Sequence, residues 1–159
     1  MSQSSPTPEN FVRGMQIIAL ALPAGVIVFA MIAVFVVGAL NTPPTGMLIS
    51  LLGAAAAFAV LIMHRLLPGV IAARAAAMQS TMHGAAHESL RPYSIYMSQM
   101  VVKLALLEGA AFFNVMCVII EHNWWSLGIA GILVGWMLTQ FPTRDRVERW
   151  IATQGMRID

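Results

Sequence analysis

Hydrophobic residues run through this chain in four long blocks separated by polar stretches. The blocks cover about residues 15–40, 47–67, 95–120 and 124–141. Each is close to the length of about 20 apolar residues that a helix needs to cross a bilayer. Because backbone polar groups find no water in hydrocarbon, helices are expected for all four. The pattern predicts an all-α integral membrane bundle of four transmembrane helices.

The polar stretches group the four blocks into two pairs. Asn41–Gly46 (NTPPTG) contains two prolines, which cannot continue a helix, and the turn His122–Trp125 (HNWW) is short. These turns predict two antiparallel hairpins, spans one–two and spans three–four. The connection of residues 68–94 is longer and alanine-rich, and it predicts a loop whose first part extends the second helix beyond a kink at Pro68.

The two ends of the chain differ in character. Residues 1–14 are polar and rich in Ser and Pro, which predicts a disordered tail. The apolar run after them exceeds the usual hydrophobic region of a signal peptide. Within residues 142–159, the stretch TRDRVERWI predicts a short amphipathic helix with Thr143 at its N-cap. Its basic side chains and tryptophan (Arg144, Arg146, Arg149 and Trp150) would seat it on anionic lipid headgroups, with a solvated basic tail as the alternative.

Composition and charge place the chain in a membrane and orient it. Hydrophobic residues make up 58% of the chain and charged residues 10%, against about 25% charged residues in soluble domains. All nine Lys and Arg residues fall on one side of the four-span arrangement, before span one, around the middle connection or after span four. The positive-inside rule then puts both termini in the cytoplasm, and we expect a bacterial-type inner membrane.

The third block contains a glutamate near its middle, Glu108. A charged carboxylate in hydrocarbon costs about 2.5–3.5 kcal/mol on insertion scales, so such residues usually have a role. Desolvation disfavours the charged form, and we therefore expect Glu108 to be protonated. Three roles are compatible with the sequence: a proton or cation site, a hydrogen bond that joins helices, or an ion pair between helices.

Other polar residues of the spans are candidate partners of Glu108. Each residue of an α-helix is rotated by about 100° about the axis relative to the one before it. On this basis five polar residues of the third helix share one quadrant, and Glu108 lies about 140° from Lys103 around the axis. That quadrant contains Gln99, Lys103, Asn114, Cys117 and Glu121. His64 is expected nearer the level of Lys103 than of Glu108, and Glu108 is expected opposite the small residues 53–57 or those just after them. The candidate supporting residues of an ion site are therefore His64, Lys103 and Asn114.

Further motifs are few. Gly128, Gly131 and Gly135 predict close helix packing in the fourth block, because small residues let backbones approach. His83 and His87 have an i, i+4 spacing but no apparent third ligand, so we expect no metal site. The sequence shows no nucleophile motif, phosphate-binding loop or nucleic-acid fold. We expect neither an enzyme, nor a cofactor, nor a nucleic-acid partner.

Residues 49–120 suggest a family. The run LLGAAAAFAVLIMHRLLPGVIAARAAA, the pair Arg91–Pro92 in a polar loop and the run LALLEGAAFFNVMCVII resemble the helical hairpin of the proteolipid (c) subunits of rotary ATPases. The resemblance implies that Glu108, followed by Gly109–Ala110–Ala111, is an ion-binding carboxylate.

The function expected from these features is that of a proton- or cation-handling membrane subunit, in a homo-oligomer or a larger membrane complex. The alternative is a non-catalytic accessory or scaffold subunit in which Glu108 is a structural hydrogen-bonding residue. A four-span transporter of small molecules is a third possibility allowed by size, although no internal inverted repeat is recognisable.

Overall fold

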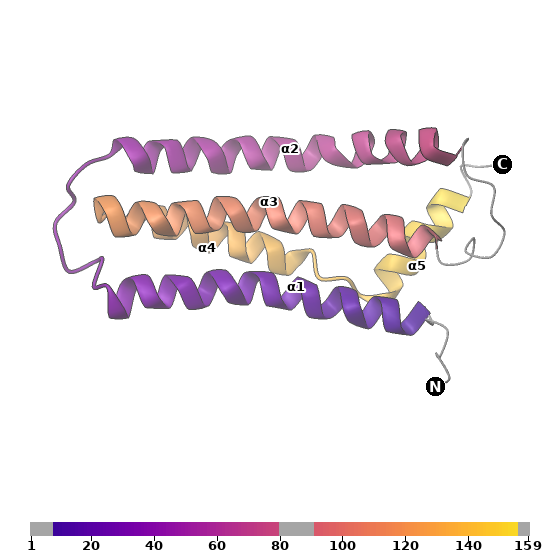
Figure 1. The fold of residues 1–159 in the computed structure, drawn as a ribbon, viewed down its shortest axis with the longest axis horizontal. Coiled ribbons are helices and arrows are strands. Elements are labelled where there is room, and N and C mark those ends of the chain that lie inside the picture. Colours follow the sequence, from indigo (N-terminus) through magenta and orange to yellow (C-terminus); the bar gives the residue numbers. More distant parts are fainter. Residues whose placement is uncertain (1–7, 80–90, 156–159) are drawn as a thin grey trace.

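The computed structural model of the protein describes residues 8–79 and 91–155, and within these ranges it is helical with no strand. The elements are α1 (Pro8–Met31), the π-helical segment η1 (Ile32–Val36), α2 (Leu48–Gln79), α3 (Arg91–Glu121), α4 (Trp124–Thr139) and α5 (Arg144–Gly155). Figure 1 shows α1, α2 and α3 as long, roughly parallel or antiparallel rods, with α5 at the end where α1 begins. The prediction of an all-α fold is confirmed for the described part of the chain.

Three of the described helical segments are long and apolar enough to cross a membrane: Val12–Val36, Leu48–Leu66 and Ile95–Glu121. A fourth qualifies only if α4 and the start of α5, which meet at a bend of 73°, count as one broken span. The 16 residues of α4 extend about 24 Å, less than the roughly 30 Å of the hydrocarbon core. The structure therefore supports three to four membrane-spanning helices.

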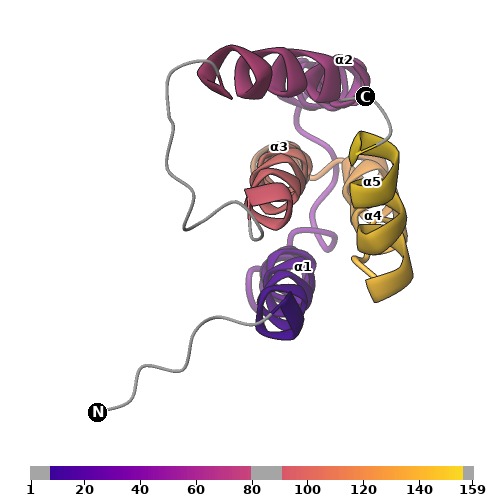
Figure 2. The same ribbon diagram turned by 90° about the vertical axis from the view of Figure 1, so that its right-hand side faces the viewer.

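The helix α3 occupies the centre of the molecule. Figures 1 and 2 show α1 on one side of α3, α2 on the other and α4 alongside. Helix α3 packs against all three, whereas α1 and α2 do not pack against each other. The α3–α4 hairpin is a packed pair, but the expected hairpin of spans one and two is not confirmed, because α3 lies between its two helices.

The first helix begins earlier than the sequence pattern indicated. Residues Pro8 to Gly14 belong to α1, although they fall in the tail predicted to be disordered. Proline is tolerated in the first turn of a helix because backbone N–H groups there have no acceptor within the helix, so the N–H that proline lacks is not needed. Glu9 in the same turn is favoured by the positive end of the helix dipole. Residues 1–7 lie outside the described part of the chain.

Much of the connection over residues 68–94 is helical, and the predicted extension of the second helix beyond Pro68 is present. Helix α2 passes Pro68 and ends at Gln79, and α3 begins at Arg91. Alanine is the strongest helix former, and the alanine-rich stretch after Pro68 continues α2 for that reason. Pro92 stands in the first turn of α3, where proline is tolerated. His83 and His87 lie outside the described residues.

The core lies where α1, α3 and α4 meet. Its members recur every three or four residues along each helix, as expected for packed helical faces. Helix α1 contributes Met15, Ala19 and Val26, α3 contributes Leu104, Leu107 and Val115, and α4 contributes Ala130, Leu133 and Met137. Large apolar side chains on the outside of the bundle are exposed, among them Phe35 at 82% and Leu48 at 77%.

Candidate functional site

Glu108 lies on the face of α3 that meets α1. A Cβ atom added at Gly25 of α1 would stand 3.8 Å from Oε1 of Glu108 and 3.8 Å from the ring of Phe112. One turn further along, the rings of Phe29 and Phe112 have centroids 5.3 Å apart. Glu108 is half-buried at this contact. Glu108 contacts α1 rather than α2, so the expected position opposite residues 53–57 of α2 or those just after them is not observed as a contact.

The carboxyl group of Glu108 has no hydrogen bond or ion pair within the described part of the chain. A hydrogen bond that joined helices through this side chain would need a donor or acceptor on α1, and Gly25 contributes only its backbone there. The site is thus a carboxyl between two helices, beside a glycine and an aromatic ring. Such a group can take up and release a proton without breaking a structural contact.

The three candidate supporting residues lie away from Glu108. The imidazole Nε2 of His64 lies 2.9 Å from Oε1 of Gln140, and the His64 ring meets Trp136 edge-on with centroids 6.4 Å apart. These contacts join α2 to the end of α4. Lys103 is half-buried in the quadrant opposite Glu108. The structure therefore does not gather His64, Lys103 or Asn114 around the carboxyl group.

A polar seam, formed by Asn114, Cys117 and Glu121 of α3, holds α3 against α2. Nδ2 of Asn114 donates to the carbonyl of Gly53 at 3.1 Å and to that of Ala110 at 2.9 Å. The thiol of Cys117 donates to the carbonyl of Ile49 at 3.3 Å. Side-chain bonds to backbone carbonyls on another helix are typical of contacts inside membranes, where a lone polar group is costly.

Gly53 is the residue of α2 that lets this seam close. A Cβ atom at this position would stand 2.9 Å from Sγ of Cys117 and 3.0 Å from Oδ1 of Asn114. A contact this short requires the side chains of Cys117 and Asn114, or the helices themselves, to move. Asn114 is fully buried, and its Oδ1 atom, which has no hydrogen-bond partner among the described residues, lies against this glycine. The absence of a side chain at Gly53 therefore sets the distance between α2 and α3.

The seam ends in what we call the α2 clamp: Glu121, His122 and Asn123 of the α3–α4 turn, with Ile49 and Ser50 of α2. The two carboxylate oxygens of Glu121 accept hydrogen bonds from the backbone N–H groups of Ile49 at 2.8 Å and Ser50 at 2.7 Å. These N–H groups belong to the first turn of α2, where no carbonyl of the same helix is available. A carboxylate also suits the positive end of the helix dipole.

The neighbours of Glu121 fix the two loops at this end of the bundle. Nδ2 of Asn123 donates to the carbonyl of Gly46 and, at 3.1 Å, to the hydroxyl of Ser50. His122 has a positive φ of 58°, and its Nδ1 lies 2.8 Å from the carbonyl oxygen of Ala39. The backbone N–H of Thr45 donates to the carbonyl of Glu121 at 3.0 Å.

Glu121 lies in the polar quadrant of α3 that the sequence predicts, and no role was predicted for it there. An acidic residue at the last position of a long apolar block, followed by a polar turn, is the signal that could have found the clamp. Its partners were not predictable from local sequence, because they are backbone groups more than 70 residues away, with separations of 71 and 72 residues for Ser50 and Ile49.

The glycines of α4 face away from the rest of the molecule. A Cβ atom at Gly128, Gly131 or Gly135 would meet nothing within 4 Å. The prediction that these residues pack helices closely is thus not met inside this chain. Gly131 instead lines an apolar groove of about 280 Å³ between α4 and the end of α1 with η1.

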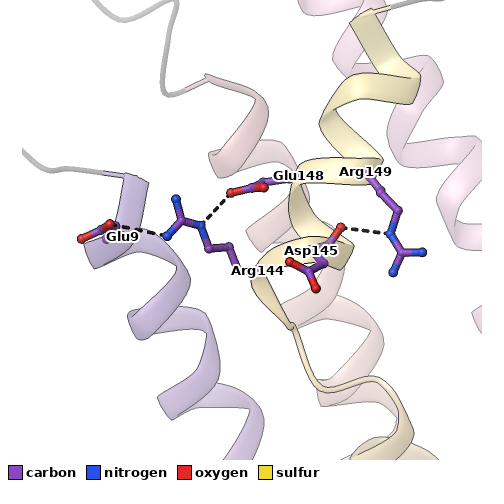
Figure 3. Close-up of polar contacts among 5 residues, drawn as sticks. All are labelled: Glu9, Arg144, Asp145, Glu148 and Arg149. Carbon is purple, nitrogen blue, oxygen red and sulfur yellow. Dashed lines mark hydrogen bonds and ion pairs between the residues drawn. The ribbon is translucent and has the colours of Figure 1, made fainter.

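The arginines of α5 bind groups of the protein itself. Arg144 pairs with Glu9 of α1 at 3.6 Å and with Glu148 at 2.7 Å, and Nε of Arg149 donates to the carbonyl of Asp145 at 3.1 Å (Figure 3). Arg146 donates to the carbonyl of Thr139 at 2.9 Å.

The apolar face of α5 packs on the beginning of α3. Val147 is fully buried, and the ring of Trp150 contacts that of Tyr96 with centroids 5.3 Å apart. Val147 and Trp150 thus share one helix face, as the sequence predicted, but that face contacts protein.

Comparison of the chain with known protein families, with characterised proteins and with solved structures finds no match. Among the described residues, no group of three or more His, Cys, Asp or Glu side chains is placed to hold a metal ion. The functional argument therefore depends on the geometry of Glu108 and its surroundings.

Proposed function

We propose that the protein is a small membrane subunit that handles protons or cations through Glu108. The observation that carries the proposal is the half-buried carboxyl of Glu108 on a membrane-spanning helix, without a hydrogen-bond partner among the described residues. A purely structural glutamate gains its stability from fixed partners, as Glu121 does. A carboxyl without such fixed partners can change its protonation state as protons or cations reach it.

The resemblance of residues 49–120 to the proteolipid hairpin of rotary ATPases is part of the same proposal. Its support in the fold is that α2 and α3 run antiparallel and pack side by side (Figure 1). Gly25 of α1 lies next to the carboxyl, and Gly109 directly follows Glu108 in the chain. In this proposal the protein works as a homo-oligomer or within a larger membrane complex.

We further propose a four-span topology with both termini in the cytoplasm of a bacterial-type cell, in which α4 and the start of α5 form a bent fourth span. The basic residues of α1 and α5 lie at the end of the molecule where both helices meet (Figure 1), which supports this orientation. Arg149 and the exposed side of α5 would then face lipid headgroups. Reporter fusions at Thr45 and Asn123 should be periplasmic, and a cytoplasmic reporter at Thr45 in intact protein would overturn the topology.

Carbodiimide labelling tests the role of Glu108 directly, because the reagent attacks protonated carboxyls that are accessible from lipid. The wild-type protein in lipid should be labelled between about pH 6 and 8, where a desolvated carboxyl remains protonated. Glu108→Gln should abolish the labelling and any ion-coupled activity while the protein still folds. Glu121→Gln is the matched control on the same helix and should remain labelled at Glu108. An unlabelled wild-type protein, with an ionised Glu108 by infrared difference spectroscopy, would refute the proposal.

The alternative function is that of a non-catalytic accessory or scaffold subunit. The observation that favours it is the outward-facing set Gly128, Gly131 and Gly135, which leaves room for another helix. The two functions differ in one result. If the protein is a scaffold, Gly131→Leu should release partner subunits from the purified complex and Glu108→Gln should leave it fully active.

A further inference from the structure

We propose that Glu121 is a proton-operated latch that holds the first turn of α2 against α3. Both carboxylate oxygens are engaged, at 2.8 Å from the N–H of Ile49 and 2.7 Å from the N–H of Ser50. Nδ2 of Asn123 adds a longer contact of 3.5 Å to the same carboxylate. Glu121 as a whole is 5% exposed. This inference concerns a different glutamate from the proposed ion site and stands independently of it.

Protonation of Glu121 changes what the carboxyl group offers. An ionised carboxylate accepts at both oxygens, whereas the protonated group places a hydrogen on one of them. That oxygen then carries an O–H group that faces a backbone N–H, so two donors face each other. One backbone N–H of the first turn of α2 therefore loses its acceptor. An unsatisfied buried N–H is unfavourable, so the turn separates from α3. The hydrogen bonds that hold the latch exist above the pH at which Glu121 takes up a proton and are lost below it.

Two other titratable groups lie at the clamp. Cys117 is one turn earlier on α3, and His122 is the next residue in the chain. The loop of residues 40–47, the first turn of α2 and the first turn of α4 carry no acidic or basic side chain. His122 is joined to Ala39 rather than to Glu121. Its imidazole can donate from Nδ1 to that carbonyl in both the neutral and the charged form, so the contact does not depend on its protonation.

Cys117 is a built-in reporter of the latch. It is the one cysteine of the chain, it is fully buried, and its thiol donates to the carbonyl of Ile49 at 3.3 Å. Ile49 is also held by Glu121. Release of the first turn of α2 therefore exposes the thiol, and no introduced label is needed.

The experiment measures the reaction of Cys117 with a membrane-permeable dithiodipyridine in the full-length protein in lipid. Each rate is divided by that of the same protein unfolded in SDS at the same pH, which removes the intrinsic pH dependence of the thiol. Between about pH 7 and about pH 3, a range that ends well below the usual pKa of a free glutamate, the relative rate in the wild type should rise roughly tenfold or more, as expected when hydrogen bonds to a charged group are lost. Glu121→Gln should give a high rate at every pH.

Three further variants separate the latch from other causes. Asn123→Ala removes the side-chain donor to the carboxylate and should move the rise to higher pH. Together with the wild-type curve, this variant tests the latch if Glu121→Gln fails to fold. Glu108→Gln should match the wild type, so that failure of the latch and failure of the proposed ion site are distinguishable. His122→Asn, which tolerates the positive φ, should keep the response. A flat wild-type rate, or a response abolished by Glu108→Gln or His122→Asn, would overturn the proposal.

Discussion

Glu108 and Glu121 stand on the same helix, about 20 Å apart along its axis, and their surroundings differ in almost every respect. Glu121 ends α3 with both oxygens bound by N–H groups of α2, and it is 5% exposed. Glu108 lies in the middle of α3, half-buried against Gly25, and has no partner among the described residues. The contrast separates two kinds of carboxyl group. One kind stabilises the fold through hydrogen bonds at both oxygens, and the other has no such bonds and is available to bind a proton or a cation.

Replacement of each glutamate by leucine gives the sharpest test of this contrast. Glu121→Leu leaves the N–H groups of Ile49 and Ser50 without acceptors, and we expect the unfolding temperature to fall by about 5 °C or more. Glu108→Leu removes no hydrogen bond and should leave the unfolding temperature unchanged or higher. Thermal unfolding in matched lipid or detergent, followed by circular dichroism, measures both. Equal destabilisation by the two changes would remove the distinction.

A pair of glycine substitutions tests the packing beside each region. At Gly53 an added methyl would stand 2.9 Å from Cys117 and 3.0 Å from Asn114, and Gly53→Ala should cost about 1–3 kcal/mol of unfolding free energy through overpacking. At Gly25 the nearest atoms would be 3.8 Å away. Gly25→Ala should therefore be neutral or stabilising by up to about 1 kcal/mol, because alanine is the better helix former. SDS titration in mixed micelles gives both values, and a neutral Gly53→Ala would contradict the close approach of α2 and α3.

The smallest effect is expected at the opposite end of the molecule from the clamp. Glu9 and Arg144 form an ion pair at 3.6 Å with side chains that are 77% and 66% exposed (Figure 3). Solvent screens such a pair, and Glu9→Gln should change the free energy of unfolding by less than about 0.5 kcal/mol. The same titration measures it. A loss of several kcal/mol would mean that the contact between α1 and α5 carries far more of the stability than its exposure implies.

The sequence predicted the helices and one polar face of α3, and it could not predict which helices are neighbours. Long apolar blocks specify membrane helices by themselves, and the shared quadrant of Asn114, Cys117 and Glu121 follows from helical geometry. The packing of α3 between α1 and α2 depends on contacts between residues far apart in the chain. Gly53 illustrates the limit, since its role appears only once the two side chains opposite it are known.

The shortness of α4 has a consequence for the surrounding lipid. If α4 crosses the membrane as proposed, its 16 residues cover only about 24 Å, so beside it the bilayer thins by several ångströms or the link at Gln140–Thr143 lies within the hydrocarbon. Such mismatch costs fractions of a kcal/mol per ångström and falls on one side of the molecule, where Gly128, Gly131 and Gly135 face outward. The protein should accordingly concentrate in thin membranes and deplete long-chain lipids from the neighbourhood of α4.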